Sequence, residues 1–283
     1  MQLKKAIYNT IGKTYSSTRR ADKKIVSRLK DALFLNELKE HGRLVDIGSG
    51  SGNYTIAIAN KTKDINIVGI EPSSVMIDQA SDNFKKQGLY NNVKFVQAFA
   101  NKIPFRDNYF DGLTCILATH HFNDLQSSIK DMMRVVKSNS RVVILTADPR
   151  LKDALWIDRY FGFLVESARD AYVPISDLLG ILNPYALKPI SVEPLLLSKD
   201  IEDLFFLSGW ARPELYLNED VRKGISHFAK SMQSEEGRNM IDRAINKLES
   251  DINSNYWSKK YKSQVESISG YDGGYRIVSF TKR

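Results

Sequence analysis

Five short apolar runs alternate with stretches of helical length between residues 43 and 147, and this alternation constrains the fold more than any other feature of the chain. Continuous apolar runs bounded by Gly, Asp, Asn or Pro are typical of strands buried on both faces of a sheet. Strand, helix, strand repeated in this way predicts a parallel sheet with right-handed crossovers. The runs are RLVDIG (43–48), INIVGIE (65–71), VKFVQ (93–97), FDGLTCILA (110–118) and RVVILTAD (141–148).

The residues that follow this unit are too many to serve only as connections. They contain two further strand candidates, PISVEPLLL (189–197) and YRIVSFTK (275–282), and two strands need only about twenty residues. Most of the surplus is an aromatic stretch at 150–186 and polar helical stretches within 211–268. We therefore expect extra helices over the carboxyl ends of the strands, as a lid inserted into one domain rather than a second independent domain.

A single cysteine and the absence of a long apolar stretch exclude several classes of protein. One Cys cannot form an intrachain disulfide, and a structural zinc site would usually need two or more. Cys115 lies in an apolar run, so we interpret it as a core residue and expect no metal site. No stretch approaches the roughly 18 apolar residues of a membrane span, and no signal peptide is recognisable. We expect a cytoplasmic protein without a membrane span.

The net charge of +8 is concentrated near the N-terminus. Residues 1–41 carry ten Lys and Arg against four Asp and Glu, whereas the rest of the chain is nearly balanced. A nucleic-acid-binding protein would more often show a basic face across its whole domain. The basic segment from Ala21 to about Lys39 is read either as a solvated helix or as a binding element, and we do not expect a nucleic-acid partner.

The strongest chemical signal is VDIGSGSGNY (45–54), where a buried strand leads into three glycines and then a helix. Glycines permit a tight turn and let the backbone approach a ligand at the positive end of the following helix. A dinucleotide fingerprint, GxGxxG, would need its third glycine at the position of Asn53, but here it comes one place early, at Gly52. The form acidic-x-GxGxG, with Asp46, is instead the one recognised in S-adenosylmethionine (SAM) sites.

Glu71 ends the second strand candidate and is followed by Pro72. A carboxylate at that position can accept hydrogen bonds from both hydroxyls of a ribose, and it disfavours a 2′-phosphate by charge repulsion. The alternative for a lone Glu at a strand end is a structural role beside a helix N-terminus. The spacing from the glycine loop favours the ribose role.

The chain resembles the class I SAM-dependent methyltransferases of the type 11 group, which includes ubiquinone-biosynthesis and trans-aconitate methyltransferases. The resemblance covers about residues 8–148 and the tail less securely. It implies a Rossmann-like α/β fold with a seven-stranded, mostly parallel sheet, helices on both faces, an antiparallel last strand and helical lid insertions. The motifs that carry it are VDIGSGSG, IEPS, VQAFANKIPF (96–105), YFDGLTCILATHHF (109–122), YNTIGKTYSSTR (8–19), SGWARPELYL (208–217) and GYRIVSFTK (274–282).

The resemblance implies roles for individual residues. Asp46 and the amides around Gly48 to Gly50 would hold the methionine portion of SAM, Glu71 would bind the ribose, and the segment at 99–101 would line the adenine. Many relatives have Asp where this chain has Phe99, so stacking would replace the usual carboxylate contact. The predicted cofactor-binding residues are Tyr15, Arg19, Asp46, Gly48, Ser49, Gly50, Gly52, Glu71, Pro72, Phe99, Ala100, Asn101, Leu117 and Ala118.

The same resemblance suggests how the chain is divided. Residues 1–42 would form an N-terminal helical flap, in which Tyr15 could stabilise the sulfonium and Arg19, or its neighbour Arg20, could pair with the methionine carboxylate. Residues 43–148 would form the SAM-binding core, and residues 149–188 a lid and acceptor insertion. Residues 189–283 would complete the sheet, with a helical insertion at about 211–268.

Methyl transfer from a sulfonium is a direct displacement, so the protein must mainly align the reactants and exclude water. A neutral acceptor can also require a base, and His120 and His121 are the catalytic candidates. Each could instead pack against or cap the helix that follows. The aromatic run Trp156, Tyr160, Phe161, Phe163 and Tyr172 is read either as the lining of an acceptor pocket or as core.

The function expected from these features is transfer of a methyl group from SAM to a small-molecule acceptor at an O, N or C atom, leaving S-adenosylhomocysteine (SAH). The alternatives are an RNA or protein methyltransferase, a SAM-binding protein without catalysis and, more distantly, a nicotinamide oxidoreductase. The motifs do not specify the acceptor, the atom methylated or the oligomeric state.

Overall fold

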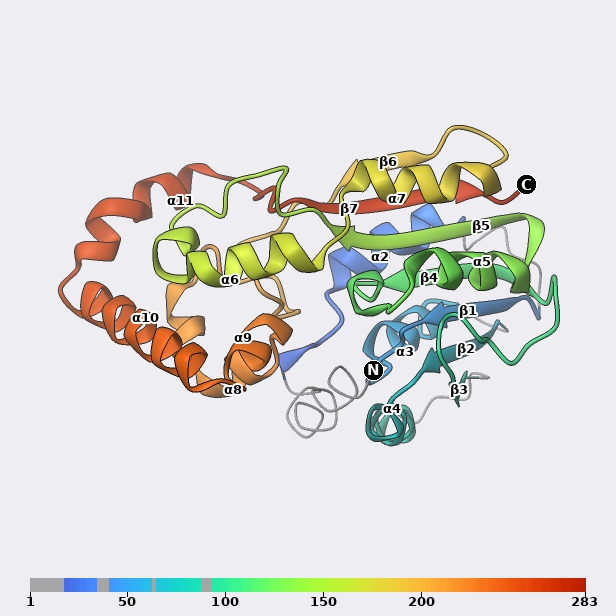
Figure 1. Ribbon diagram of the computed structural model, residues 1–283, viewed down its shortest axis with the longest axis horizontal. Helices are drawn as coiled ribbons and strands as arrows, with labels where there is room; N and C mark the ends of the chain where they lie inside the picture. Colours follow the sequence, from blue (N-terminus) through green and yellow to red (C-terminus); the bar gives the residue numbers. More distant parts are fainter. Residues whose placement is uncertain (1–17, 35–40, 63–64, 88–92) are drawn as a thin grey trace.

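The computed structural model describes residues 18–34, 41–62, 65–87 and 93–283, and its centre is a seven-stranded sheet in the order β3-β2-β1-β4-β5-β7-β6 (Figure 1). The neighbours among β1 to β5 pair in parallel, and β7 is antiparallel to both β5 and β6. The predicted Rossmann-like sheet is therefore confirmed, including its antiparallel last strand. The strands are β1 (Arg43–Ile47), β2 (Asn66–Glu71), β3 (Val93–Gln97), β4 (Phe110–Ile116), β5 (Val136–Ala147), β6 (Ser191–Pro194) and β7 (Tyr275–Thr281).

Helices bury both faces of the sheet because the central strands carry apolar side chains on each. On one face, α2 (Lys23–Ala32) and α3 (Asn53–Ala59) share a buried cluster with Leu44 and Ile67, and α4 (Ser74–Lys86) packs beside α3 against β2 and β3. On the other face, α5 (Leu125–Val135) and α7 (Ile175–Leu182) share a cluster with Val45 and Ile47. Burial of this kind contributes roughly 1.5–3 kcal/mol per large apolar side chain.

The basic N-terminal segment has a structural use in the region that is described. Asp22 caps α2 by accepting hydrogen bonds from the backbone N–H groups of Lys24 and Ile25, and Ile25 and Leu29 are buried. An amphipathic helix of this kind places its Lys and Arg side chains on the solvent side. The positions 1–17 and 35–40 of the predicted flap lie outside the described residues.

Strand β5 begins five residues earlier than the sequence pattern predicts, at Val136 rather than Arg141. Val136 pairs with Phe110, and the N–H of Asn139 donates to the carbonyl of Lys282. Asn139 adopts a positive φ of 64°, a conformation that Asn tolerates better than most residues. Pairing with a neighbouring strand and with the chain's last residues therefore overrides the helical spacing of the segment.

A helical lobe lies beyond the carboxyl ends of the parallel strands (Figure 1). Its apolar core contains Trp156, Phe161 and Trp210 and is continuous with the cluster beneath α2 and α3. The lobe comprises α6 (Ile157–Ala171), η4 (Pro213–Leu217), α8 (Glu219–Lys223), α9 (Ser226–Ser231), α10 (Glu235–Asn253), the π-helix η5 (Ser258–Lys262) and α11 (Ser263–Ser267).

The segment at 149–188, predicted as a lid and acceptor insertion, contributes to two parts of the fold. Its helix α6 belongs to the lobe, whereas α7, followed by the short η3 (Asn183–Tyr185), packs against α5 on the sheet. The division of the chain into four segments stays a prediction. None of the helices in the described ranges is both long enough and apolar enough to span a bilayer.

Candidate active site

Two adjoining cavities lie beside the sheet, and the larger of the two, of about 460 Å³, opens at the carboxyl ends of β1, β2 and β4. Eleven of the fourteen predicted cofactor-binding residues line it, and so does His121. These eleven are Arg19, Gly48, Ser49, Gly50, Glu71, Pro72, Phe99, Ala100, Asn101, Leu117 and Ala118. Of the others, Asp46 and Gly52 do not line this larger cavity, and Tyr15 lies outside the described residues.

The glycine loop, residues 48–52, forms one wall of the larger cavity. Gly50 has a φ of 54°, and a Cβ there would meet no atom of the described part of the chain within 4 Å, so the backbone faces space that a ligand can fill. Gly52 has a φ of 77° but packs inward, because a Cβ would come 2.7 Å from the Phe95 ring. Ser49 lines the cavity, and its buried hydroxyl has no hydrogen-bond partner among the residues that the structure describes. A polar ligand therefore fits this wall.

The carboxylate of Glu71 joins the end of β2 to the glycine loop. It accepts hydrogen bonds from the backbone N–H groups of Ser73, at 2.9 Å, and Gly50, at 3.1 Å. Burial raises the pKa of Glu71 to about 7, against the opposing effect of these two N–H groups. Each carboxylate oxygen has a second lone pair, so Glu71 keeps the capacity to accept two further hydrogen bonds. Glu71 also has the structural role considered as an alternative, because one of its N–H donors, Ser73, is the N-cap of α4.

Asp46 lies beneath the glycine loop and is not among the residues that line the cavity, and its contact with the methionine portion of SAM stays a prediction. Its carboxylate accepts hydrogen bonds from the hydroxyls of Thr55, at 2.6 Å, and Thr114, at 2.8 Å, and only 2% of the residue is exposed. Burial raises the pKa of Asp46 to about 6. The side chain ties the start of the loop to α3 and β4.

Arg19 is held by a carboxylate that the sequence patterns did not reveal. Its Nε donates to Asp203 Oδ1 at 2.6 Å, and the hydroxyl of Tyr54 donates to Asp203 Oδ2 at 3.0 Å. The side chain of Asn53 donates to the Arg19 carbonyl. Arg19 and Asp203 both line the larger cavity. Asp203 lies in no recognisable motif, so only the tertiary contact with Arg19 identifies it.

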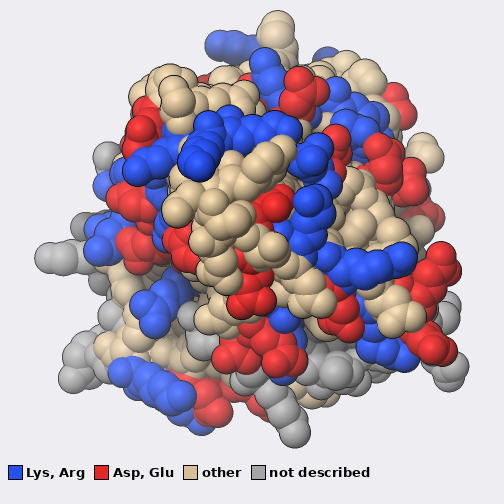
Figure 2. All heavy atoms as spheres, turned by 90° about the vertical axis from the view of Figure 1, so that its left-hand side faces the viewer, with Lys and Arg blue, Asp and Glu red and all other residues tan. Residues whose placement is uncertain are grey.

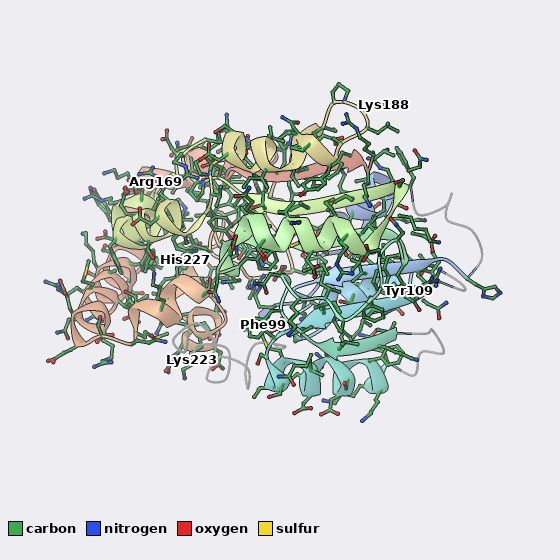
Figure 3. The ribbon with its side chains drawn as sticks, turned by 45° about the vertical axis from the view of Figure 1, so that its right-hand side comes forward. Phe99, Tyr109, Arg169, Lys188, Lys223 and His227 are labelled. Atoms are coloured by element: carbon green, nitrogen blue, oxygen red, sulfur yellow. The ribbon has the colours of Figure 1, made fainter. Side chains whose placement is uncertain are left out.

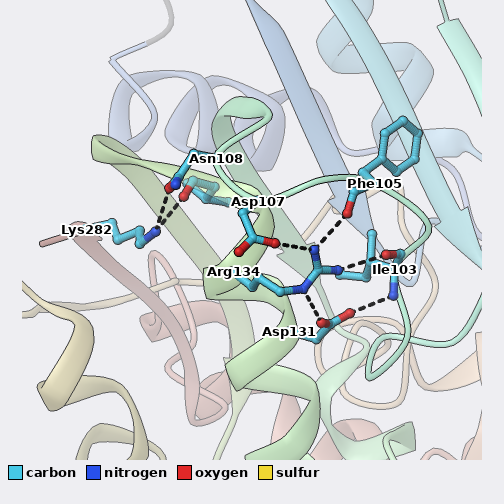
Figure 4. Close-up of polar contacts among 8 residues, drawn as sticks. Ile103, Phe105, Asp107, Asn108, Asp131, Arg134 and Lys282 are labelled. Atoms are coloured by element: carbon cyan, nitrogen blue, oxygen red, sulfur yellow. Dashed lines mark hydrogen bonds and ion pairs between the residues drawn. The ribbon is translucent and has the colours of Figure 1, made fainter.

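The loop between β3 and β4 forms the opposite wall and is anchored by α5. Arg134 donates to the carbonyls of Ile103 and Phe105, and it pairs with Asp131 and Asp107 (Figure 4). Asp131 also accepts from the N–H of Ile103. This network fixes the base of the loop that carries the segment at 99–101.

The exposed part of that loop carries Phe99, which lies on the sheet side of the molecule, whereas His227 lies on the helical lobe (Figure 3). Phe99 is 46% exposed, so part of its ring is available to a ligand. A flat aromatic face at this position can stack on another flat ring.

A smaller cavity of about 40 Å³ lies beside the larger one, and Arg19, Leu117 and His121 line both. Leu117 has a φ of 50°, a strained conformation that costs about 1–3 kcal/mol and clusters at functional sites. The surrounding structure must therefore hold the backbone of Leu117 in this conformation, which fixes its side chain at the junction of the two cavities. The remaining walls come mostly from the helical lobe and from the segments at 147–154, 205–207 and 273–275.

The two predicted catalytic histidines lie in the short helix η2 (Thr119–His121) and occupy different positions. His121 lines both cavities, whereas His120 lines only the smaller one. Their rings lie 3.7 Å apart between centroids. Neither caps the next helix, because the N-cap of α5 is Asp124, which accepts from the N–H of Ser127.

The smaller cavity also contains residues that reasoning from sequence missed or left open. His227, on α9, lines it and had been placed only in a polar helical stretch. Of the five aromatic residues considered for an acceptor pocket, Tyr172 lines this cavity, whereas Trp156 and Phe161 are fully buried in the lobe. Within the described ranges, no group of three or more His, Cys, Asp or Glu side chains is placed to hold a metal ion.

Comparison with known proteins is consistent with this geometry. Residues 45–144 match the sequence family described as a methyltransferase domain. The crystal structure named "Putative methyltransferase from antibiotic biosynthesis pathway", from Anabaena variabilis, is 32% identical, with a TM-score of 0.83, and the match covers 94% of this chain and 100% of that one.

The match to two curated relatives covers less than half of each chain. The ubiquinone/menaquinone biosynthesis C-methyltransferase UbiE of Stutzerimonas stutzeri is 35% identical over 109 residues, which are 37% of this chain and 42% of that protein. The uncharacterized methyltransferase YcgJ of Bacillus subtilis is 31% identical over 109 residues, 38% of this chain and 42% of that protein. The chain thus spans about two fifths of these relatives. The near-complete match to the Anabaena structure, together with the glycine loop and the sheet order, shows that this chain belongs to the class I SAM-dependent methyltransferases.

Proposed function

We propose that the protein transfers a methyl group from SAM to a small-molecule acceptor by direct displacement. The observation that carries this proposal is the junction of the two cavities at Leu117 and His121. The larger cavity has the polar wall that a nucleoside needs, and the smaller one has an apolar and aromatic wall for a second compound. A donor and an acceptor bound in adjoining spaces are aligned before they react.

The residues of the larger cavity suit the three parts of SAM. Glu71 would accept hydrogen bonds from the ribose hydroxyls, and the exposed ring of Phe99 would stack on the adenine. Arg19 and Asp203 carry opposite charges on the cavity wall, so the pair matches the carboxylate and the ammonium of the methionine portion. SAM, when bound, supplies an activated methyl group.

The residues at the junction would handle the acceptor. Leu117 excludes water from the path between donor and acceptor, and His121 is placed to accept the acceptor's proton, because it lines both cavities. His120, which lines only the smaller cavity, would then position the acceptor rather than take its proton. Tyr15 stays a predicted flap residue.

The test is calorimetric titration of the full chain with SAM and with SAH, followed by a transfer assay with SAM labelled in its methyl group. The variant Glu71→Ala should lose SAM binding, whereas Glu249→Ala, on the exposed side of α10, should bind as the unmodified protein does. Failure of the unmodified protein to bind either SAM or SAH would contradict the proposal.

A second candidate, a SAM-binding protein without catalysis, is favoured by one observation. The smaller cavity of about 40 Å³ has room for about three water molecules, so the lobe must open before an acceptor ring can enter. Tight SAM binding with no transfer to any compound in a broad panel would support this candidate.

Transfer to RNA receives no support from the face that the helical lobe presents. Lys and Arg are interleaved with Asp and Glu over that face (Figure 2), whereas a nucleic-acid footprint is a continuous basic patch. Retention of RNA that weakens steeply with added salt would revive this alternative.

A further inference from the structure

The charges around the smaller cavity select against a cationic acceptor. The described residues that line it include no Asp or Glu. Its two basic residues are already compensated, since Arg19 pairs with Asp203 at 2.6 Å, and Lys152, whose side chain is half exposed, lies 3.8 Å from Asp272. A buried ammonium group without a counter-charge is costly. The cavity therefore suits a neutral or anionic compound.

The shape of the cavity selects for a flat compound. The rings of His120 and His227 lie 19° from parallel, with their centroids 6.5 Å apart. Aromatic rings in direct contact have centroids about 4.5–7 Å apart, so a flat ring enters between the two imidazoles when they separate. Tyr172 adds a third ring, 4.1 Å from His120 and 6.2 Å from His227. One wall comes from η2 at the end of β4 and the facing wall from α9 of the lobe, so a ring entering between them would contact both.

His227 offers a neutral polar group within this apolar setting. Burial, and secondarily the charge of Lys230, lowers the pKa of His227 to about 4, so its imidazole is uncharged at neutral pH. From other elements it faces His120, Tyr172 and Phe206. A neutral imidazole has one nitrogen that accepts and one that donates a hydrogen bond, which suits a ring hydroxyl as partner.

We propose that the smaller cavity takes a flat aromatic compound bearing an ionisable hydroxyl group, of the phenol or naphthol class, stacked between His120 and His227. The proposal rests on the proposed function, because SAM must be the methyl donor in the adjoining cavity. In the reaction, the hydroxyl proton passes to the imidazole of His121. The oxygen forms a bond to the methyl carbon, and the C–S bond breaks with its electron pair left on the sulfur of SAH.

The cavity must widen to admit such a ring, and this requirement fixes the direction of the motion. α9 and its His227 are the wall that belongs to the lobe, whereas His120 is attached to the end of a central strand. Outward displacement of α9 opens the gap without disturbing the glycine loop. Acceptor binding should therefore change the exposure of α9 and leave that of β4 unchanged.

The test is calorimetric titration of the full chain, with and without saturating SAH, using three matched probes. These are 2-naphthol, 2-naphthalenemethanol, which is neutral but does not ionise, and 2-naphthalenemethanamine, which is cationic at neutral pH. We expect 2-naphthol to bind at least tenfold more tightly than the amine and to become methylated when labelled SAM replaces SAH. We expect 2-naphthalenemethanol to bind but not to be methylated.

Two substitutions of the same residue separate stacking from folding. His227→Ala should weaken 2-naphthol binding at least tenfold, and His227→Phe should restore most of it, because the flat ring returns. Both variants should bind SAH as the unmodified protein does. His41→Asn, at an exposed histidine whose positive φ Asn tolerates, is the matched control and should change neither titration.

The proposal is overturned if the amine binds as tightly as 2-naphthol, if His227→Ala leaves 2-naphthol binding unchanged, or if the SAH-loaded protein binds none of the three probes. Loss of SAH binding by the unmodified protein would be a different result. It would overturn the proposed function itself, and this inference with it.

Discussion

The pH dependence of SAM binding should follow the ionisation of Glu71. Glu71 lines the larger cavity, where we propose that its carboxylate holds the ribose, and burial raises its pKa to about 7. Only the ionised form offers both oxygens as acceptors, since a protonated carboxyl uses one oxygen to donate. Raising the pH from 6 to 8 increases the ionised fraction of such a group from about one tenth to about nine tenths. We therefore expect SAM to bind about tenfold more tightly at pH 8 than at pH 6.

The variant Glu71→Gln removes the ionisation and keeps the shape. Gln has one acceptor oxygen and an NH₂ group that only donates, so one ribose hydroxyl would exchange a charged for a neutral acceptor and the other would lose its acceptor. At about 1 kcal/mol or more for each, SAM binding at pH 8 should weaken by at least about 30-fold. The same variant should show almost no change in SAM affinity between pH 6 and pH 8. Asp46, whose pKa is raised to about 6, is still present in this variant, so any pH dependence that survives measures its contribution.

Isothermal titration of SAM at four pH values between 6 and 8 provides the assay, with Glu249→Gln on the exposed face of α10 as the matched control. The control should reproduce both the affinity and the pH dependence of the unmodified protein. The reasoning is refuted if the unmodified protein binds SAM equally at all four pH values. It is equally refuted if Glu71→Gln retains the full pH dependence.

Four further substitutions test the walls of the site. Gly50→Ala should lower the free energy of unfolding by only about 1 kcal/mol, through its positive φ, yet weaken SAM binding at least tenfold. Gly52→Ala should lower the free energy of unfolding by about 3 kcal/mol, because its methyl group meets Phe95. Denaturant unfolding and SAM titration of both variants separate these effects, and two variants with the same stability and the same affinity for SAM would contradict the reasoning. Arg134→Ala should lower the free energy of unfolding by about 2 kcal/mol and weaken SAM binding, because it releases the base of the β3–β4 loop. Arg238→Ala, at an exposed position, is the control. Unchanged SAM affinity in Arg134→Ala would show that the loop holds its place without α5. Asp203→Asn should destabilise the fold by about 3 kcal/mol, because Arg19 is only 14% exposed, and a thermal-unfolding midpoint equal to that of the unmodified protein would refute the buried pairing.

The sheet could be predicted from sequence because its information is local. Each central strand is a continuous apolar run with a turn residue beside it, and β3 was predicted to the residue at Val93–Gln97. The predicted start of β5 was wrong because Val136 pairs with Phe110 of a neighbouring strand. The segment LQSSIKDMMRVVKS (125–138) has apolar residues at helical spacing throughout, and this pattern conceals the pairing. The periodicity of apolar residues predicts a helix or strand correctly when its tertiary contacts favour the same structure. The prediction fails where pairing with a distant strand determines the conformation.

The candidate site divides in the same way. Gly50 and Glu71 belong to a motif whose spacing is visible along the chain, and both line the larger cavity. Asp203 and His227 come from segments without a motif, and they reach the cavities only because the lobe folds back over the strand ends. For Asp46 the motif suggests a ligand contact, which stays a prediction, but it does not reveal that the carboxylate accepts hydrogen bonds from Thr55 and Thr114.

A crystal structure of the full chain with SAH tests the central claim most directly. The account predicts that SAH occupies the larger cavity, with its ribose hydroxyls on Glu71 and its sulfur at Leu117, facing the smaller cavity. A structure in which SAH binds elsewhere, or in which its sulfur points away from the smaller cavity, would contradict the account.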